Sequence, residues 1–227
     1  MSACFENMAP QDRSERWLSI MKEGNEMYRR GKFAEAEKLY RDALAKAEEF
    51  DKADPHLAAS LSTLAWFYRE RGRHVQAGPI YEREIALWAE VLGEDHPALA
   101  ATLEKAGEFY CAQADYERAE AAYRRAVDIR RRTASDPKLE LAHCLDHLAD
   151  ICFKQGKFPD AEVLYKEALH ICEQTLGANH LWVAALLHAL AGIHQCQGNL
   201  EDAATVGAHA KAIWTSHMKS PAATPGK

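Results

Sequence analysis

The stretch Gly31-Lys32-Phe33-Ala34-Glu35-Ala36-Glu37-Lys38-Leu39-Tyr40-Arg41-Asp42-Ala43-Leu44 returns four more times, in altered form, along this chain of 227 residues. The later copies are Gly72…Ala77…Tyr81, Ala114…Ala119…Tyr123, Gly156…Ala161…Tyr165 and Gly198…Ala203…Gly207. The central alanines lie 41, 42, 42 and 42 residues apart. A fixed period in this range is typical of solenoids, in which each unit buries its apolar face only against its neighbours. The repeat therefore predicts the fold, and the function is to be sought on the surface that stacking creates.

Each copy predicts two helices joined by a short turn. Before the first copy, apolar residues recur at helical spacing, and Arg29-Arg30-Gly31 ends that helix with cations in its last turn and glycine at its end. A second helix begins near Phe33. Asp54-Pro55 starts the next pair, because aspartate caps a helix and proline suits its first position. Asp136-Pro137 repeats the signal, and Asp95-His96-Pro97 and Asn179-His180 are variants of it. These signals predict an all-α chain of ten helices in five pairs.

The predicted organisation has three parts. It comprises a flexible N-terminal leader (1–10), a repeat array (11–217, with repeats at about 11–53, 54–95, 96–135, 136–178 and 179–217) and a disordered tail (218–227).

Composition narrows the class of protein. A hydrophobic content of 48% with 27% charged residues indicates a globular chain, and a mixed net charge of −6 argues against a general nucleic-acid binder. No apolar run approaches the roughly 20 residues that span a bilayer, and residues 1–17 do not form a secretory signal. The six cysteines show no CxxC pair. We expect reduced thiols that serve as small buried apolar groups, and a cytoplasmic location.

A small residue in the first helix of each pair, together with the alanine in the second, resembles the tetratricopeptide repeat. The period of about 42 and the connectors Leu92–Pro97 and Leu176–His180 are similar to the long repeats of kinesin light chains. The resemblance covers about nine-tenths of the chain. It implies a right-handed α-α superhelical solenoid of five hairpins that acts as a non-catalytic adaptor or scaffold, binding a peptide or helix of a partner protein in its concave groove.

In this family the first helix of each pair lines the groove. The resemblance therefore implies a partner-binding set made of Lys22, Asn25, Tyr28, Arg29, Thr63, Trp66, Arg69, Glu104, Lys105, Glu108, His143, Asp146, His147, Asp150 and His188. We expect Trp66 and Tyr28 to anchor the partner segment, with an acidic portion of that segment near Arg29 and Arg69. The alternative is that Trp66 packs between repeats and the charges form a solvated face.

The first repeat is also similar to chaperone-binding tetratricopeptide domains, which clamp a C-terminal carboxylate. Asn25 matches the clamp asparagine, and Lys105 falls where the clamp has an arginine. Met21, Thr63 and Ala101 stand where that family has lysine, asparagine and lysine. Loss of two cations removes most of the charge-assisted bonding to a carboxylate.

His143 and His147 define a second hypothesis, that of a metal-binding or regulatory subunit. The two histidines are four residues apart and share a helix face, as do Asp146 and Asp150, while His188 can approach from a later helix. Nearby carboxylates would favour the charged imidazoles, which would make partner binding depend on pH between about 5 and 7. There is no HExxH motif, phosphate-binding glycine loop or nucleophile elbow, so no enzyme, cofactor or metal is predicted.

The last predicted helix differs from the others. Gly207 replaces the aromatic, and an apolar stripe has no following repeat to cover it; the stripe consists of Ala203, Val206, Ala210, Ile213 and Trp214. This stripe predicts a homodimer, or a structural assembly element, joined through the C-terminal helix.

Overall fold

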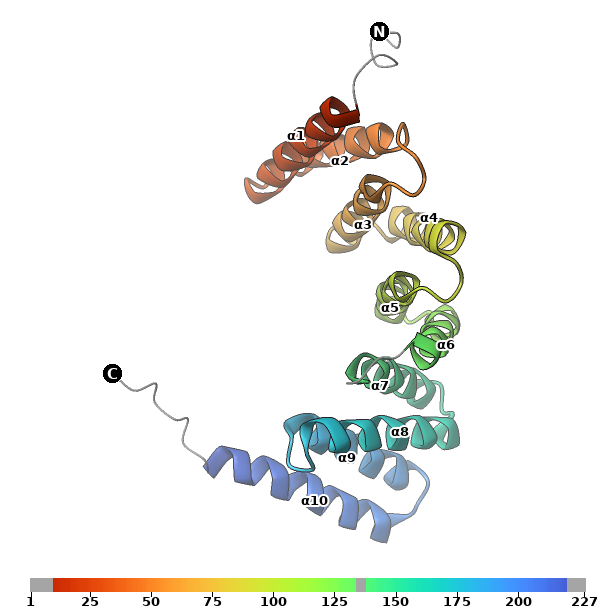
Figure 1. The fold of residues 1–227 in the computed structure, drawn as a ribbon. Coiled ribbons are helices and arrows are strands. Elements are labelled where there is room, and N and C mark those ends of the chain that lie inside the picture. The colour runs from red at the N-terminus through yellow and green to blue at the C-terminus, as the bar shows by residue number, and fades with distance from the viewer. Residues whose placement is uncertain (1–9, 134–137, 220–227) are drawn as a thin grey trace, which may run out of the picture. The chain divides into compact units, whose positions relative to one another are not determined.

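The structure, a computed structural model, describes residues 10–133 and 138–219 (Figure 1). Within these ranges the chain forms ten helices in five antiparallel pairs and no strand, as predicted. The helices are α1 (Pro10–Arg29), α2 (Phe33–Ala47), α3 (Pro55–Glu70), α4 (His74–Leu92), α5 (Pro97–Ala112), α6 (Tyr116–Thr133), α7 (Leu139–Lys154), α8 (Phe158–Leu176), α9 (Leu181–Cys196) and α10 (Leu200–Lys219). None of them combines the length and apolarity needed to cross a bilayer.

Some sequence predictions lie outside the described residues. They are the leader up to Ala9, the Asp136-Pro137 cap, Cys4, and the tail from Ser220 onward. The tail was predicted to begin at Met218, but α10 continues through Lys219.

The chain divides into two units, Met1–Thr102 and Leu103–Lys227. In the first unit, α1 packs on α2, α2 on α3 and α3 on α4. The repeat alanines Ala36 and Ala77 are fully buried there, and Tyr40 and Tyr81, four residues later, are buried beside them. Small residues at these positions let neighbouring helices approach, and each tyrosine fills the space one turn along.

The second unit repeats this packing from α6 to α10, each helix against the next. Ala119, Ala161 and Ala203 are buried, as are Tyr123 and Tyr165. Cys144, Cys152 and Cys172 are also buried in this unit, which confirms their predicted role as small apolar core residues. Burial raises the pKa of the Cys172 thiol to about 11, so this thiol stays protonated and unreactive at neutral pH. The prediction of buried thiols was wrong for Cys196, which is exposed, and Cys111 is only half-buried.

Histidines cap two of the helices. Asp54 caps α3 as predicted, accepting from the backbone N–H of His56 at 2.9 Å. At α5 and α9, however, the cap is His96 or His180, whose Nδ1 accepts from the N–H two residues on, at 3.2 and 3.1 Å. The neutral imidazole nitrogen therefore satisfies one of the unpaired donors at each of these helix starts.

The turn inside the third pair carries backbone strain. Gly31, Gly72, Gly156 and Gly198 end the first helix of four pairs with positive φ, and Ala114 occupies that position in the third pair with φ of 59°. The left-handed conformation is unfavourable by roughly 1–2 kcal/mol for a residue with a Cβ, whereas glycine adopts it without this steric cost.

We therefore expect Ala114→Gly to raise the free energy of unfolding by about 1 kcal/mol. Gly156→Ala is the matched reverse change, because a Cβ there would meet no atom within 4 Å and only the backbone would be strained. It is expected to lower stability by about the same amount. Urea unfolding followed by circular dichroism measures both; a neutral or negative effect of Ala114→Gly would contradict the strain.

Candidate functional site

The predicted partner-binding residues lie on the first helices of the pairs. We call the first-unit residues the N-terminal surface (Lys22, Asn25, Tyr28, Arg29, Thr63, Trp66 and Arg69) and the second-unit residues the C-terminal surface (Glu104, Lys105, Glu108, His143, Asp146, His147, Asp150 and His188). None of these fifteen side chains is fully buried, although their exposure differs widely.

An aromatic pair lies at the centre of the N-terminal surface. The rings of Tyr28 in α1 and Trp66 in α3 lie 4.8 Å apart, and both side chains are half-buried. Tyr28 also contacts Phe33 at 5.5 Å and Phe67 at 6.2 Å, edge to face. Trp66 therefore joins two hairpins, as the alternative interpretation proposed, while part of its ring stays open to solvent. Replacing it with alanine would lower stability as well as remove an anchor.

The polar side chains of the N-terminal surface differ in their exposure and in the partners they already have. Arg29 is largely exposed, at 71% of its side chain, with its guanidinium 3.4 Å from Glu26. Arg69 is 31% exposed and lies 3.4 Å from Glu70. The amide oxygen of Asn25 accepts a hydrogen bond from the hydroxyl of Tyr40 at 2.8 Å, and Thr63 donates to the carbonyl of Ala59. Asn25, the residue that matches the carboxylate clamp, thus already holds a tyrosine of its own repeat.

On the C-terminal surface, carboxylates have partners within the protein. Glu104 accepts from Arg130 at 2.9 Å, and its side chain is only 16% exposed. Asp146 accepts from the indole N–H of Trp182 at 2.9 Å, and Asp150 pairs with Lys154 at 2.6 Å. Glu104 and Asp146 were predicted to face a partner; these contacts show that both help to join helices. Lys105, Glu108, His143 and His188 are exposed.

The two histidines of α7 do face each other, with their Nε2 atoms 3.2 Å apart. In the part of the chain that the structure describes, no group of three or more His, Cys, Asp or Glu side chains is placed to hold a metal ion. Burial, followed by the nearby His143, lowers the pKa of His147 and outweighs the carboxylates of Asp146, Glu108 and Asp150. The expectation that carboxylates favour the charged form was therefore wrong for His147, because the ring is half-buried against Tyr123.

A pocket of about 370 Å³ opens on this surface, and we call it the polar pocket after the charged side chains in its lining. It is lined by Glu108, Cys111 and Ala112 from α5, Tyr123 from α6, and His147, Asp150, Ile151 and Lys154 from α7. Only Glu108, His147 and Asp150 of these were predicted site residues. Cys111, Ala112, Ile151 and Lys154 come from the ends of α5 and α7, and Tyr123 comes from the second helix of its pair. They were not predicted, because the prediction took only groove positions on the first helix of each pair.

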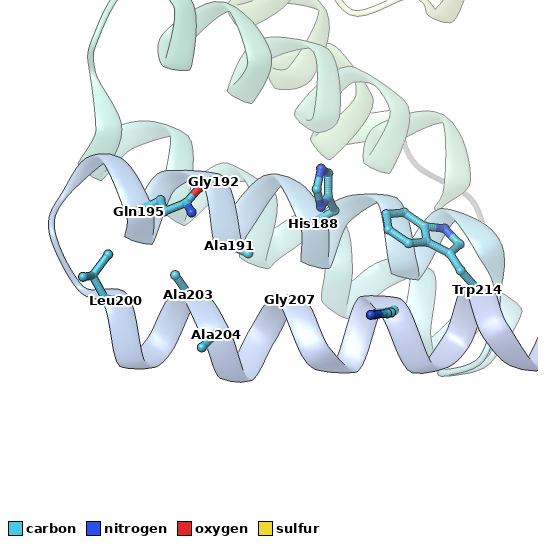
Figure 2. A pocket seen from close by; sticks show the side chains of 10 residues that line it. His188, Ala191, Gly192, Gln195, Leu200, Ala203, Ala204, Gly207 and Trp214 are labelled. Carbon is cyan, nitrogen blue, oxygen red and sulfur yellow. The ribbon is translucent and has the colours of Figure 1, made fainter.

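A second hollow, of about 510 Å³, lies between α9 and α10 (Figure 2). Its lining is largely apolar and small, including Ala191, Gly192, Ala203 and Gly207, with His188, Gln195, Lys211 and Trp214 at its polar or aromatic positions. In the other four pairs a buried tyrosine occupies the position that Gly207 has here. The missing aromatic ring therefore accounts for the hollow.

The apolar stripe of α10 is less open than predicted. Ala203, Ala210 and Ile213 are buried, and Val206 and Trp214 are half-buried, because α10 packs closely on α9. The prediction that the stripe is uncovered was therefore wrong for Ala203, Ala210 and Ile213. This removes the main reason to expect a homodimer through the C-terminal helix.

Comparison with known proteins now agrees with the fold. Tetratricopeptide repeat family models match residues 24–49, 56–132 and 140–216, so the chain belongs to the tetratricopeptide repeat family. Comparison with curated protein sequences gives no match.

Solved structures confirm the expected likeness to kinesin-light-chain-type repeats. The crystal structure of BtubC (BKLC) from P. vanneervenii is 24% identical with a TM-score of 0.73, covering 90% of this chain and 81% of that one. A Podosopora anserina putative kinesin light chain with nearly identical TPR-like repeats is 23% identical with a TM-score of 0.75, covering 90% and 98%. The apo form of RapI is 16% identical with a TM-score of 0.72, covering 87% and 53%. At these identities the likeness shows the fold alone.

Proposed function

We propose that the chain is a non-catalytic protein-interaction module, an adaptor or scaffold, that binds a peptide or helix of a partner protein on the first-helix surfaces of its repeats. Tetratricopeptide arrays use such surfaces, and packed hairpins hold them in place before binding, so the receptor loses little ordering entropy.

The observation that carries this proposal is the half-exposed Tyr28–Trp66 pair beside Arg29 and Arg69. Partly open aromatics next to arginine are the side chains that dominate protein interfaces. The rings are also held by their neighbours on α1 and α3, so they offer apolar area without having to be ordered. A partner segment with an apolar anchor and acidic residues fits this arrangement.

The test is capture of partner proteins from a lysate by wild-type chain and by an Arg29→Ala, Arg69→Ala double variant. The double variant is expected to lose at least ten-fold in retention of its main partner, and the wild-type signal is expected to fall with added salt, because charged contacts at the rim of an interface are screened.

The matched control is Lys38→Ala, Arg83→Ala, which removes the same charge from exposed positions on α2 and α4 of the same unit. It should retain wild-type capture. Equal loss in both double variants would reduce the effect to net charge, and equal capture by all three proteins would refute the arginine contacts.

A metal-binding or regulatory role for His143 and His147 is the second candidate. The 3.2 Å between their Nε2 atoms supports it, because two imidazoles on one metal ion approach to about this distance. Calorimetric titration of tag-free protein with zinc tests the idea, and a His143→Ala variant is its control. Absence of heat with the wild type would dismiss it.

A further inference from the structure

The hollow between α9 and α10 keeps the floor on which the tyrosine of the first pair lies, but it contains no ring of that kind. In the first pair a Cβ added to Gly24 would come within 2.8 Å of the Tyr40 ring, so the ring lies directly on the small residue of the first helix. Ala191 is that small residue in the fifth pair. It lines the hollow, because Gly207 places no side chain over it.

The ends of the hollow are also less filled than in the first pair. Tyr28 and Phe33 pack there edge to face, with their ring centroids 5.5 Å apart. The corresponding residues of the fifth pair are Gln195 and Leu200, which stand at one end of the hollow (Figure 2). Relative to the first pair, the fifth pair thus lacks these two rings as well as the tyrosine. The space of about 510 Å³ that remains is wide enough to admit an aromatic side chain from outside.

The chemistry of the lining favours an uncharged ring. His188 and Trp214 stand at the other end of the hollow with ring centroids 5.3 Å apart, and a further ring beside them would gain the edge-to-face or offset contacts that aromatic groups prefer. Among the described residues that line the hollow there is no carboxylate, so a lysine or arginine side chain would lose water without gaining a counter-charge. Lys211 is exposed, which lets its ammonium stay in water while its aliphatic stem borders the hollow.

The joint between the first two pairs shows how a ring reaches such a place from a neighbouring element. Phe67 of α3 is 1% exposed, and its ring lies 5.6 Å from that of Tyr40 in α2. In α1 the corresponding residue, also two positions after the small residue of its helix, is Glu26, which pairs with Arg30 at 2.7 Å. The first helix of a second copy would therefore bring a carboxylate rather than a ring. This favours a different protein as the source of the ring.

We propose that the hollow between α9 and α10 binds an uncharged aromatic side chain of a partner protein. The ring takes the place that the repeat tyrosine has in the other four pairs, with Ala191 beneath it and the rings of His188 and Trp214 at its edge. The inference rests on the proposed function only in that a protein supplies the ring. It adds an anchor in the second unit to the one that we propose at Tyr28 and Trp66.

The test uses the full chain and the small probe Nα-acetyl-tryptophan methylamide. The probe is titrated while NMR follows the backbone amide signals of Gly192 and Gly207, which line the hollow, and of Gly156, a turn residue of the same unit that does not. We expect saturable shifts at Gly192 and Gly207 and none at Gly156. Nα-acetyl-alanine methylamide is expected to bind about ten-fold more weakly or less, because a methyl group buries little apolar surface. Nα-acetyl-arginine methylamide should be equally weak, because no carboxylate receives it.

Three variants decide the assignment. Gly207→Tyr restores the residue of the other pairs, and its Cβ would start 3.7 Å from that of Ala191, so the protein should stay folded while the tryptophan probe binds about ten-fold more weakly. Gly192→Leu fills the hollow from α9, where an added Cβ would meet no atom within 4 Å, and should weaken the probe about five-fold. Ala208→Tyr places the same ring on an exposed position of α10 and should leave binding unchanged.

Unchanged affinity in folded Gly207→Tyr, or equal shifts with the alanine or arginine probe, overturns the proposal. Two further results would assign the hollow to another occupant. Signals of Gly192 and Gly207 that move on dilution of the free protein would assign it to a second copy. Nuclear Overhauser contacts between the Trp214 ring and the methyl groups of residues 222–224 would assign it to the chain's own C-terminal segment. The probes do not involve Arg29 or Arg69, so this proposal and the proposed function can each fail alone.

Discussion

Gly107→Ala is expected to lower the free energy of unfolding by about 2 kcal/mol, whereas Gly207→Ala, the same change in another helix of the same unit, is expected to raise it by about 0.5–1 kcal/mol. Both glycines lie in helix interiors, where alanine is the better helix former. The two positions differ in what the added methyl group would meet.

At Gly107 the new Cβ would come within 2.5 Å of the buried Tyr123 ring, which cannot retreat because His147 stacks on it. At Gly207 it would come only within 3.7 Å of the Ala191 Cβ, an ordinary contact at the edge of the hollow. Overpacking costs 1–3 kcal/mol in such cores, more than the gain in helix propensity. Urea unfolding by circular dichroism gives both values, and an equal change in the two variants would show that packing does not distinguish the glycines.

Local signals predicted the helices well for a physical reason. Helix spacing, the Asp54-Pro55 cap and the glycines that end first helices act within a few residues, so they can be recognised in the chain itself. The histidine caps at His96 and His180 were seen only as variants of an aspartate–proline start. Their role depends on which ring nitrogen meets a backbone N–H, and this requires coordinates.

The candidate site was predicted less completely, because partners across helices cannot be read from spacing along one helix. Glu104 was assigned to the groove, yet Arg130 of the next helix holds it. A signal for this was present: Tyr123, Val127 and Arg130 follow at intervals of four and three, so an arginine stands on the buried face of α6 and needs a carboxylate. Tyr123 and Lys154 were likewise missed in the polar pocket because neither lies at a groove position of a first helix.

Arg130→Ala is expected to cost about 3 kcal/mol of unfolding free energy, which is near the lower end for breaking a buried ion pair. Arg130 is 9% exposed and binds Glu104 of α5 at 2.9 Å and Glu140 of α7, so one guanidinium joins three helices. Burial opposes its charge, but Glu104 and Glu140 outweigh burial and raise the pKa of Arg130. Truncation would leave the carboxylate of Glu104 in a poorly hydrated place without its cation, and that unpaired charge supplies most of the cost.

The neighbouring residue provides the control. Arg131 pairs with Glu167 at 2.7 Å on the exposed side of the same helix, and Arg131→Ala should cost less than about 1 kcal/mol because solvent screens the pair. The double variant Arg130→Met, Glu104→Gln removes both charges while keeping similar volumes, so it should regain at least about half of the loss seen for Arg130→Ala. Urea midpoints of the four proteins measure these differences. If Arg130→Ala and Arg131→Ala lose the same stability, the burial of the guanidinium between α5, α6 and α7 contributes nothing, and the double variant would then show no recovery.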